Sequence, residues 1–388
     1  MTVVTNLEGC ELGPIRPPSE ANSLLLRVTR NCPWNKCAFC PVYKRTKFSR
    51  RSEDELIAEI DLLAEAAEHV RQRAGVDAGS DDITGRDVLT VINDPAASDE
   101  ERRVALWLSR GARRVFLQDA DSLVIPPKRV VPVLEHLRAR FPTVDRVTTY
   151  ARSRTLAKRT PEQLAELRAA GLTRIHVGVE SGSDAVLELV TKGCRAEHHL
   201  RGCSAVREAG FELTCYVMPG LGGRALSEEH ARETARVLKE IDPHHVRLRT
   251  LFLDCGVPLH EAQREGRFEI CEEDEIVVEI QAMLRGLIGA TGRVISDHDR
   301  NLLMEIEGQL TDDAERLDGI CAHFLDLPRD QQDAFVVARR SGYFRSLEGF
   351  LSDRRAVETF TQVAGKLRER GNGSLVRGME LELGPRSI

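Results

Sequence analysis

The sequence lacks a long apolar run, a secretory leader and an excess of positive charge. No stretch approaches the roughly 20 apolar residues that span a bilayer. Residues 1–8 have neither the basic nor the apolar region of a signal peptide. Lys and Arg number 55 against 61 Asp and Glu, for a net charge of −6. This balance argues against a nucleic-acid coat or an anionic membrane as the main partner, and we expect a cytoplasmic protein.

The composition does support a folded protein with unpaired cysteines. Of the 388 residues, 41% are hydrophobic and 30% are charged, so the chain can bury a core. Ten cysteines are present. In a reducing compartment they are not expected to form disulfides, and clustered ones are better interpreted as metal ligands or catalytic groups.

Short apolar runs alternate with helical patterns over residues 21–260. The predicted strands are 24–29, 115–117, 147–150, 175–179, 213–217 and 246–249. Strands that alternate with helices of this length indicate parallel βαβ units. Six such units predict an α/β fold, a partial (β/α)6 TIM-type barrel. A doubly wound sheet is the alternative, but no G-x-G-x-x-G opens the first helix, which disfavours its dinucleotide-binding form.

The remaining segments divide into a lead-in, an insertion and a helical end. Residues 1–20 precede the first strand, and the polar stretch near 71–96 is interpreted as an irregular insertion or loop. Residues 261–388 are predicted to be a mainly helical C-terminal region that ends in a frayed tail from Gly371. Its predicted helices are 273–289, 311–326, 328–341 and 353–370.

Three cysteines, Cys32, Cys37 and Cys40, lie within nine residues directly after the first strand. In a parallel α/β fold this is the carboxyl end of a strand, where ligands bind. A structural zinc site takes four protein ligands, but the next cysteine is Cys194. Three thiolates on a four-iron, four-sulfur cluster would leave one iron open for another ligand. The spacing therefore favours an iron–sulfur cluster over zinc.

This segment resembles the cluster loop of the radical S-adenosylmethionine (radical SAM) superfamily. The usual spacing there is C-x3-C-x2-C with an aromatic residue before the last cysteine, and Phe39 stands at that position. Here four residues separate Cys32 from Cys37, which makes a variant C-x4-C-x2-C motif. The added residue enlarges the loop and leaves the adjacent C-x2-C intact.

Later segments extend the resemblance to about residues 14–268. Residues 118–122 stand where members hold the methionyl amino group, and 178–182 read G-V-E-S-G, like the G-x-E-S-G of coproporphyrinogen-dehydrogenase and methylthiotransferase relatives. Residues 218–223 resemble the exit of the fifth strand, beside adenine. The chain is most similar to stand-alone Fe–S oxidoreductases of this superfamily. The resemblance implies cofactor contacts from Phe39, Asp121, Glu180, Ser181, Met218 and Gly220.

The resemblance also implies the chemistry. A [4Fe-4S] cluster on the three cysteines would cleave S-adenosyl-L-methionine (SAM) reductively to a 5′-deoxyadenosyl radical. That radical would abstract hydrogen from an unidentified small, anionic substrate, with a flavodoxin or ferredoxin as electron donor. Two alternatives stay open: a non-catalytic iron–sulfur or zinc-binding interaction protein on the same barrel, and an RNA-modifying radical SAM enzyme. The negative net charge disfavours nucleic acid as a partner.

Strand alternation separates core residues from candidate ligands. Glu180 is predicted to face inward, where a carboxylate needs a polar partner: either the ribose of SAM or a structural ion pair. In the sixth strand Val246 and Leu248 should face outward, leaving Arg247 and Arg249 inward. An inward guanidinium requires an anion. We expect Arg247 to form a structural ion pair. Arg249 is expected either to bind an acidic group of a ligand or to form a structural ion pair as well.

Three further features have both a functional and an ordinary interpretation. Cys255 should lie just past the sixth strand, where its thiol could donate a hydrogen atom or ligate another iron, or be there by coincidence. The basic run 44–51 is either a solvated loop or a docking patch for an acidic flavodoxin or ferredoxin. Residues 297–299, Asp-His-Asp, resemble a metal or acid–base cluster, although a helix cap by Asp297 explains them equally well.

Overall fold

A computed structural model describes residues 10–76 and 83–383 of the chain. The chain divides into two compact units. The first unit consists of Met1–Pro33, Arg45–Val177 and Ala205–Glu212. The second consists of Trp34–Lys44, Gly178–Ser204 and Leu213–Ile388. The predicted boundary near residue 260, between a barrel core and a helical region, stays a prediction.

Parallel strands form the first unit's part of the main sheet. They are β1 (Leu24–Arg27), β4 (Arg114–Gln118), β5 (Arg146–Ala151) and most of β6 (Leu172–Glu180). Leu24 is in register with Val115, and Val115 with Val147. All three side chains are buried, as expected for strands covered by helices.

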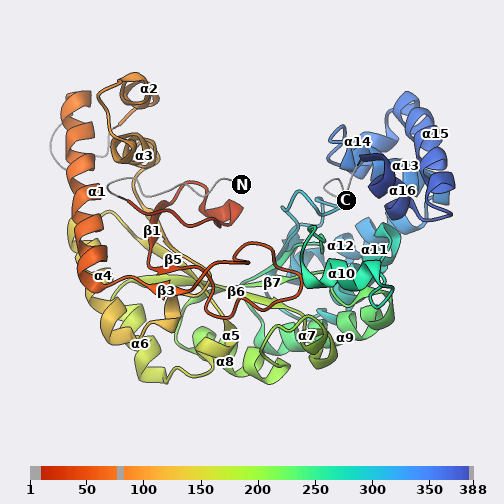
Figure 1. The fold of residues 1–388 in the computed structure, drawn as a ribbon, viewed down its shortest axis with the longest axis horizontal. Helices are drawn as coiled ribbons and strands as arrows, with labels where there is room; N and C mark the ends of the chain where they lie inside the picture. Colours follow the sequence, from red (N-terminus) through yellow and green to blue (C-terminus); the bar gives the residue numbers. More distant parts are fainter. Residues whose placement is uncertain (1–9, 77–82, 384–388) are drawn as a thin grey trace. The chain divides into compact units, whose positions relative to one another are not determined.

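The helices of the first unit pack beside one another (Figure 1). The long helix α1 (Glu53–Ala74) contacts α3 (Asp99–Leu108) and α4 (Pro127–Arg140), and α4 contacts α6 (Pro161–Ala169). At the start of α1, the Ser52 hydroxyl accepts the N–H of Glu55 while the Glu55 carboxylate accepts the N–H of Ser52. This reciprocal cap explains why the helix begins here. The short elements of this unit are η1 (Pro18–Glu20), β2 (Thr29–Arg30), β3 (Ser49–Arg50), η2 (Ser122–Val124) and α5 (Ser153–Leu156).

In the second unit the sheet continues from the end of β6. It contains β7 (Glu212–Val217), β8 (His245–Leu248), β9 (Arg293–Ile295) and β10 (Gly308–Gln309), which is antiparallel to β9. Helices α9 (Gly223–Ile241) and α11 (Glu273–Gly286) contact each other. Their apolar side chains and those of the strands line a small cavity that includes Val217, Val246 and Leu248. The outward orientation predicted for Val246 and Leu248 is therefore confirmed.

The eight-stranded sheet has the order β1-β4-β5-β6-β7-β8-β9-β10. All six predicted parallel strands are present, so the α/β class is confirmed. Because β1 and β10 are edge strands, the barrel is open, in agreement with the predicted partial (β/α)6 barrel. Strands β9 and β10 were not expected, since two- and three-residue strands carry no readable alternation.

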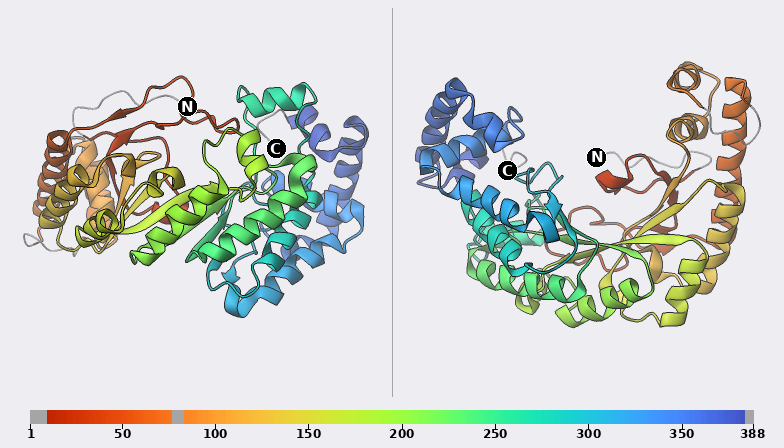
Figure 2. Two further views of the ribbon diagram at one scale, coloured as in Figure 1. Left: turned by 90° about the horizontal axis from the view of Figure 1, so that it is seen from below. Right: turned by 180° about the vertical axis from the view of Figure 1, so that it is seen from behind.

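The C-terminal region is helical, as predicted (Figure 2). The Phe324, Phe335 and Phe350 rings are buried there and pack against one another. The remaining helices of the second unit are α7 (Asp184–Leu189), α10 (Pro258–Arg264), α12 (Leu310–Leu325), α13 (Arg329–Arg340), α14 (Leu347–Leu351), α15 (Arg354–Arg370) and α16 (Leu375–Leu383). Helix α8 (Ala196–Glu208) begins in the second unit and ends in the first.

Two predicted irregular segments contain helices instead. The predicted frayed tail holds α16, which contacts α15. A Cβ on Gly378 would lie 1.9 Å from the carbonyl oxygen of Leu367, so glycine at this position permits the close packing of α16 on α15. The predicted insertion 71–96 holds α2 (Gly85–Asn93), which begins at a cap formed by Thr84 and Asp87. Residues 77–82 of that insertion lie outside the described part.

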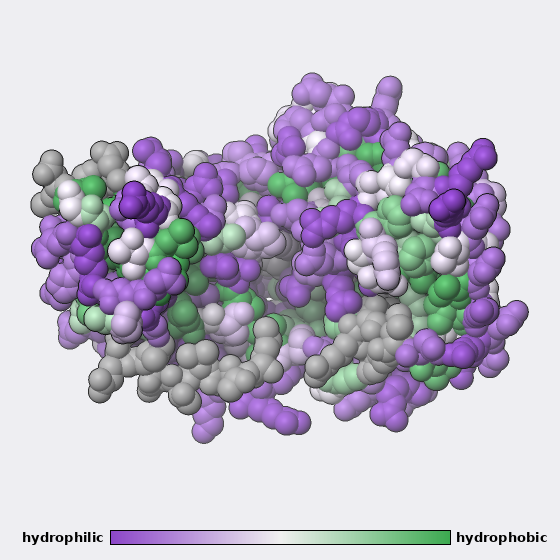
Figure 3. All heavy atoms as spheres, turned by 90° about the horizontal axis from the view of Figure 1, so that it is seen from above, coloured by the Kyte–Doolittle hydropathy of each residue, from purple (hydrophilic) through white to green (hydrophobic). Residues whose placement is uncertain are grey.

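No helix in the described ranges is long and apolar enough to cross a membrane. Hydrophilic side chains are spread over both units on the face drawn in Figure 3. Charged residues make up 30% of the sequence, which accounts for this distribution.

Candidate functional site

In the first unit, Cys32 follows β2 and Asn31, whose backbone is held by a hydrogen bond. Asn31 has a left-handed backbone, with φ of 69°, a conformation that asparagine adopts more readily than most residues. Its N–H donates to Oδ2 of Asp119 at 3.1 Å, and the guanidinium of Arg27 donates to the same oxygen at 2.9 Å. Asp119, which is fully buried, therefore fixes the start of the cysteine loop. Sequence reasoning missed this role.

Asp121 lies at the carboxyl end of β4 and is fully buried. The Thr155 hydroxyl donates to Oδ2 at 2.5 Å, whereas Oδ1 has no hydrogen-bond partner among the described residues. Burial raises the pKa of Asp121 to about 6, although the Thr155 hydrogen bond and the Arg152 charge oppose the shift. A buried oxygen without a donor is costly. Asp121 can therefore accept a hydrogen bond from a bound cation.

In the second unit, the loop of residues 34–44 carries Cys37 and Cys40, which are both half-buried. It is held by the segment that follows α7. The indole N–H of Trp34 donates to the carbonyl oxygen of Thr191 at 2.8 Å, and the N–H of Ala38 donates to that of Val190 at 2.8 Å. A Cβ at Gly193 would lie 2.3 Å from the Trp34 ring. Only glycine at this position leaves room for the ring.

The interior of the same loop is fixed by Asn35 and Lys44. Asn35 has a left-handed φ of 48°, and its amide donates to the carbonyl oxygen of Tyr43 at 2.5 Å. The Lys44 ammonium donates to the carbonyl oxygens of Asn35 and Cys37, at 3.2 and 2.9 Å. The longer Cys32–Cys37 spacing is thus accommodated in an ordered loop. Lys44 is engaged in this loop and does not belong to an open basic patch.

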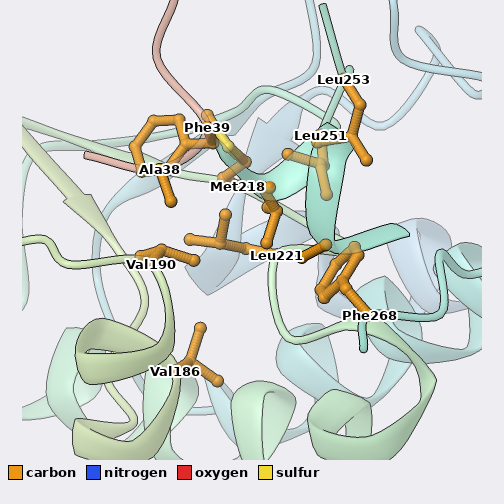
Figure 4. Packing of buried hydrophobic residues seen from close by; sticks show 11 residues of the cluster. Ala38, Phe39, Val186, Val190, Met218, Leu221, Leu251, Leu253 and Phe268 are labelled. Atoms are coloured by element: carbon orange, nitrogen blue, oxygen red, sulfur yellow. The ribbon is translucent and has the colours of Figure 1, made fainter. Parts of the chain in front are cut away.

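Phe39 covers the apolar side of the cysteine loop. It packs in one cluster with Met218, Leu221 and Leu251, and Cys37 and Cys40 lie against that cluster. Figure 4 shows the side chains of Phe39, Met218, Leu221 and Leu251 close together. Apolar surroundings exclude water and strengthen electrostatic interactions at the two thiols.

Glu180 ends β6 and pairs with a lysine that the sequence did not single out. The ammonium of Lys192 lies 2.9 Å from Oε1 of Glu180 and 5.7 Å from the centre of the Phe39 ring. Burial alone would lower the pKa of Lys192, but the charges of Glu180, Cys37 and Cys194 raise it above its ordinary value. Lys192 therefore stays charged beside the cysteine loop.

A buried network joins the ends of β6 and β7. His230 Nε2 lies 3.0 Å from the carbonyl oxygen of Met218, and its Nδ1 lies 2.8 Å from the hydroxyl of Ser181. Because a carbonyl only accepts, Nε2 of His230 carries a proton. Glu279 accepts the N–H of Gly220 at 2.7 Å. The predicted cofactor residues Ser181, Met218 and Gly220 are thereby positioned by two side chains that sequence reasoning missed.

At the end of β8 the two arginines differ. Arg247 is buried and forms an ion pair with Asp297 at 3.1 Å, as expected for a structural pair. Arg249 follows the last residue of β8, Leu248, and its side chain is exposed. Because β8 ends one residue before Arg249, strand alternation does not fix the direction of its side chain, and the predicted inward direction stays a prediction. Cys255 is also exposed.

The residues present fit an iron–sulfur cluster. Within the described ranges, no group of three or more His, Cys, Asp or Glu residues converges at the spacing of a single metal ion. A [4Fe-4S] cluster binds each cysteine through a different iron, so its ligands need not converge on one point. The ordered loop supplies two half-buried thiols against an apolar cluster, and Cys32 is held by the contacts of its neighbour Asn31.

Comparison with known proteins identifies the domain. The model of the radical SAM superfamily matches residues 26–238. The chain is 32% identical to GTP 3′,8-cyclase 2 of Pseudomonas aeruginosa over 117 residues, 29% of this chain and 33% of that protein. It is 22% identical to the tRNA uridine(34) acetyltransferase of Methanocaldococcus infernus over 122 residues, 30% of this chain and 22% of that protein. The matches thus span a third or less of these curated relatives.

Among solved structures, coproporphyrinogen III oxidase from Escherichia coli is similar with a TM-score of 0.43 and 17% identity. That match covers 69% of this chain and 52% of the other.

Proposed function

The chain belongs to the radical SAM superfamily, and on that premise we propose that Cys32, Cys37 and Cys40 hold its [4Fe-4S] cluster. It is an enzyme whose cofactors are this cluster and SAM. When bound and reduced, these cofactors supply a 5′-deoxyadenosyl radical that takes a hydrogen atom from the substrate. The observation that carries the proposal is the cysteine loop itself, within a family match over residues 26–238.

Each unit carries side chains that suit a part of SAM. The Oδ1 atom of Asp121 is buried without a donor and can accept the methionyl ammonium. Lys192 is a buried cation beside the cysteine loop and can bind the carboxylate. The Lys192 ammonium lies 2.9 Å from Oε1 of Glu180, and we assign Oε2 of Glu180 to a ribose hydroxyl.

The end of β7 suits the adenine ring. Met218 is buried in the apolar cluster that includes Phe39, and Gly220 has a φ of 83°. Ser181 has its hydroxyl engaged by His230 and by the N–H of Ser183. Its side chain therefore acts as a positioning group, and any contact of Ser181 with SAM would come from its backbone.

We propose a flavodoxin or ferredoxin as the electron donor. Of the basic run 44–51, Lys44 binds the cysteine loop and Arg51 is buried with Glu59. Arg45, Lys47 and Arg50 are exposed. We therefore assign the docking of the electron donor to these three side chains. The affinity for the donor should fall as the ionic strength rises.

The substrate is proposed to be a small anionic molecule. The match to a GTP cyclase supports this class, and the match to a tRNA-modifying enzyme supports RNA as the second candidate. Cys255 is exposed past β8 and is the candidate donor of a hydrogen atom to a substrate radical. Deoxyadenosine yield with a small-metabolite fraction, compared with the yield with unfractionated tRNA, separates the two classes.

The experiment that tests the function is anaerobic SAM cleavage. The reconstituted chain, supplied with dithionite and SAM, should release 5′-deoxyadenosine and methionine. Cys37→Ala should abolish the release, and Cys321→Ala, which removes a buried thiol of α12, should not. Wild-type protein that carries a full cluster but produces no deoxyadenosine would refute the proposed function.

A further inference from the structure

The loop after β9 is fastened to the carboxyl end of β8. The Asn301 side chain is buried, and its Oδ1 accepts the N–H of Thr250 at 2.9 Å and the Thr250 hydroxyl at 3.1 Å. Its Nδ2 donates to the carbonyl oxygen of Leu248 at 2.8 Å. These three bonds fix residues 296–301 beside Arg249. The two loops can therefore present side chains to one ligand.

Three nitrogen-bearing side chains stand on these two loops: Arg249 after β8, and His298 and Arg300 after β9. Arg249 is exposed, and no carboxylate of the described residues lies within ion-pair distance of it. The guanidinium of Arg300 lies 4.0 Å from the centre of the Phe252 ring, which orients it. Nδ1 of His298 accepts the N–H of Arg300 at 3.1 Å. In the neutral imidazole, Nε2 is then an N–H donor.

The local electrostatics favour an anion. Burial and the positive charge of Arg249, together with Arg300 and Arg340, lower the pKa of His298 to about 4, against the opposing charge of Asp299. The ring is therefore neutral at pH 7.

Of the four nearest acids, two are engaged by arginines outside this group and two act on Arg300. Asp297 pairs with Arg247 at 3.1 Å, and Glu273 pairs with Arg340. The negative charges of Asp254 and Asp299 raise the pKa of Arg300, against the larger lowering by burial. None of these carboxylates forms an ion pair with Arg249 in the described ranges.

This group of residues lies at the edge of the sheet where SAM is proposed to bind. The N–H of Arg249 donates to the carbonyl oxygen of Val217 at 2.9 Å, and that of Leu251 donates to Pro219 at 2.8 Å. The segment after β8 therefore runs along the segment after β7, which carries Met218 and Gly220. Ligands of parallel α/β folds bind at this edge.

We propose that Arg249, His298 and Arg300 form an anion-binding subsite for a carboxylate or phosphate group of the substrate. The identity of the ligand as substrate rests on the proposed function. The carboxylate of SAM is assigned elsewhere, because Lys192 is a separate buried cation beside the cysteine loop. Two guanidinium groups and a neutral imidazole N–H together suit the several oxygens of such an anion.

The test titrates the full-length chain, with its oxidised cluster, with inorganic phosphate and separately with acetate. Histidine ¹⁵N resonances are recorded, and His298→Asn assigns the His298 signal. We expect a saturable shift of that signal with at least one of the two anions, and the tighter one identifies the acidic group. Arg249→Gln should weaken binding by about tenfold, the loss of one charged contact. The control Arg201→Gln, an exposed arginine of α8, should bind like wild type.

Three results would overturn the inference: no anion-dependent shift of His298 in the wild type, equal affinities of wild type and Arg249→Gln, or displacement of the anion by SAM. Arg249 is exposed, so its replacement should leave the melting temperature unchanged, which excludes unfolding as the cause of lost binding. No reductant is present, so the titration is independent of SAM cleavage. If the wild type binds phosphate but releases no deoxyadenosine, the proposed function fails while the subsite stands.

Discussion

The ammonium of Lys192 lies 2.9 Å from Oε1 of Glu180, twelve residues earlier in the chain. Both side chains are largely buried, with 11% and 13% of their surfaces exposed. Phe39 lies on another side of the ammonium. The pair thus connects the end of β6 to the loop that carries Cys37 and Cys40, and it places a fixed positive charge beside the proposed cluster ligands.

Lys192→Met should weaken both the fold and SAM binding. The change leaves the Glu180 carboxylate without its partner, at a cost of about 2 kcal/mol in free energy of unfolding. It also removes the cation proposed for the carboxylate of SAM. Lys239→Met, which replaces an exposed lysine of α9, is the matched control. Denaturant unfolding and equilibrium dialysis with SAM measure the two effects. If Lys192→Met had the free energy of unfolding and the SAM affinity of the wild type, Lys192 would not belong to the site.

Gly178→Ala should disrupt the same pair without touching either partner chemically. A Cβ at residue 178 would lie 2.4 Å from Oε1 of Glu180 and 3.2 Å from the Lys192 ammonium. We expect weaker SAM binding and a lower melting temperature. Gly365→Ala is the control, because nothing lies within 4 Å of its Cβ in the middle of α15. Alanine there should stabilise the helix by up to about 1 kcal/mol. Equal melting temperatures of the two variants would contradict the tight approach at Gly178.

Glu279→Ala should loosen the turn after β7. Glu279 accepts the N–H of Gly220 at 2.7 Å and the hydroxyl of Ser227 at 2.6 Å. Its removal leaves a buried N–H without an acceptor, which costs about 2 kcal/mol. SAM affinity should fall because Gly220 and Met218 lose their support. Ser227→Ala removes one of the two bonds and leaves the Gly220 contact intact, so its effect should be smaller. Equal losses in the two variants would show that the Gly220 contact does not matter.

The stability of the chain should carry a pH dependence from Asp121. Its pKa is about 6 in the folded protein, against an ordinary value of 3.8. As the pH rises from about 4 to 6, the unfolded chain releases this proton first. The Asp121 contribution to the free energy of unfolding therefore falls over that window and stays lost above it. Asp121→Asn should flatten this part of the profile, measured by denaturant unfolding at closely spaced pH values. An unchanged slope in the variant would contradict the raised pKa.

Local patterns predicted the strands and helices of the sheet well. Ile175, Val177 and Val179 alternate in sequence, and all are fully buried. The cap at Ser52 was readable because its two partners are three residues apart. The segments that local patterns did not predict depend on tertiary contacts or are very short. Helix α16 follows Gly371 and Gly373, which resemble a chain end in the sequence, and it packs on α15, where Gly378 meets Leu367. The shortest strands, β9 and β10, have too few residues for alternation to show.

The site was predictable only where the motif lies within one short segment. The three cysteines lie within nine residues of the sequence. Lys192, in contrast, contacts Glu180 because α7 and the turn after it return the chain to the end of β6. His230 and Glu279 lie on two different helices. No period or spacing connects them to Ser181 and Gly220. Alternation predicts a side-chain direction only within a strand, and β8 ends at Leu248, so the direction of Arg249 stays a prediction.

The central claim is that Cys32, Cys37 and Cys40 hold a cluster with one iron open to SAM. Electron paramagnetic resonance of the reduced chain, recorded with and without SAM, tests it most directly. We expect about four irons and four sulfides per chain and a reduced-cluster signal whose g-values change when SAM is added. Each cysteine-to-alanine variant of the three should lose the signal. Stoichiometric zinc in anaerobically purified protein, or a cluster signal that SAM leaves unchanged, would contradict the claim.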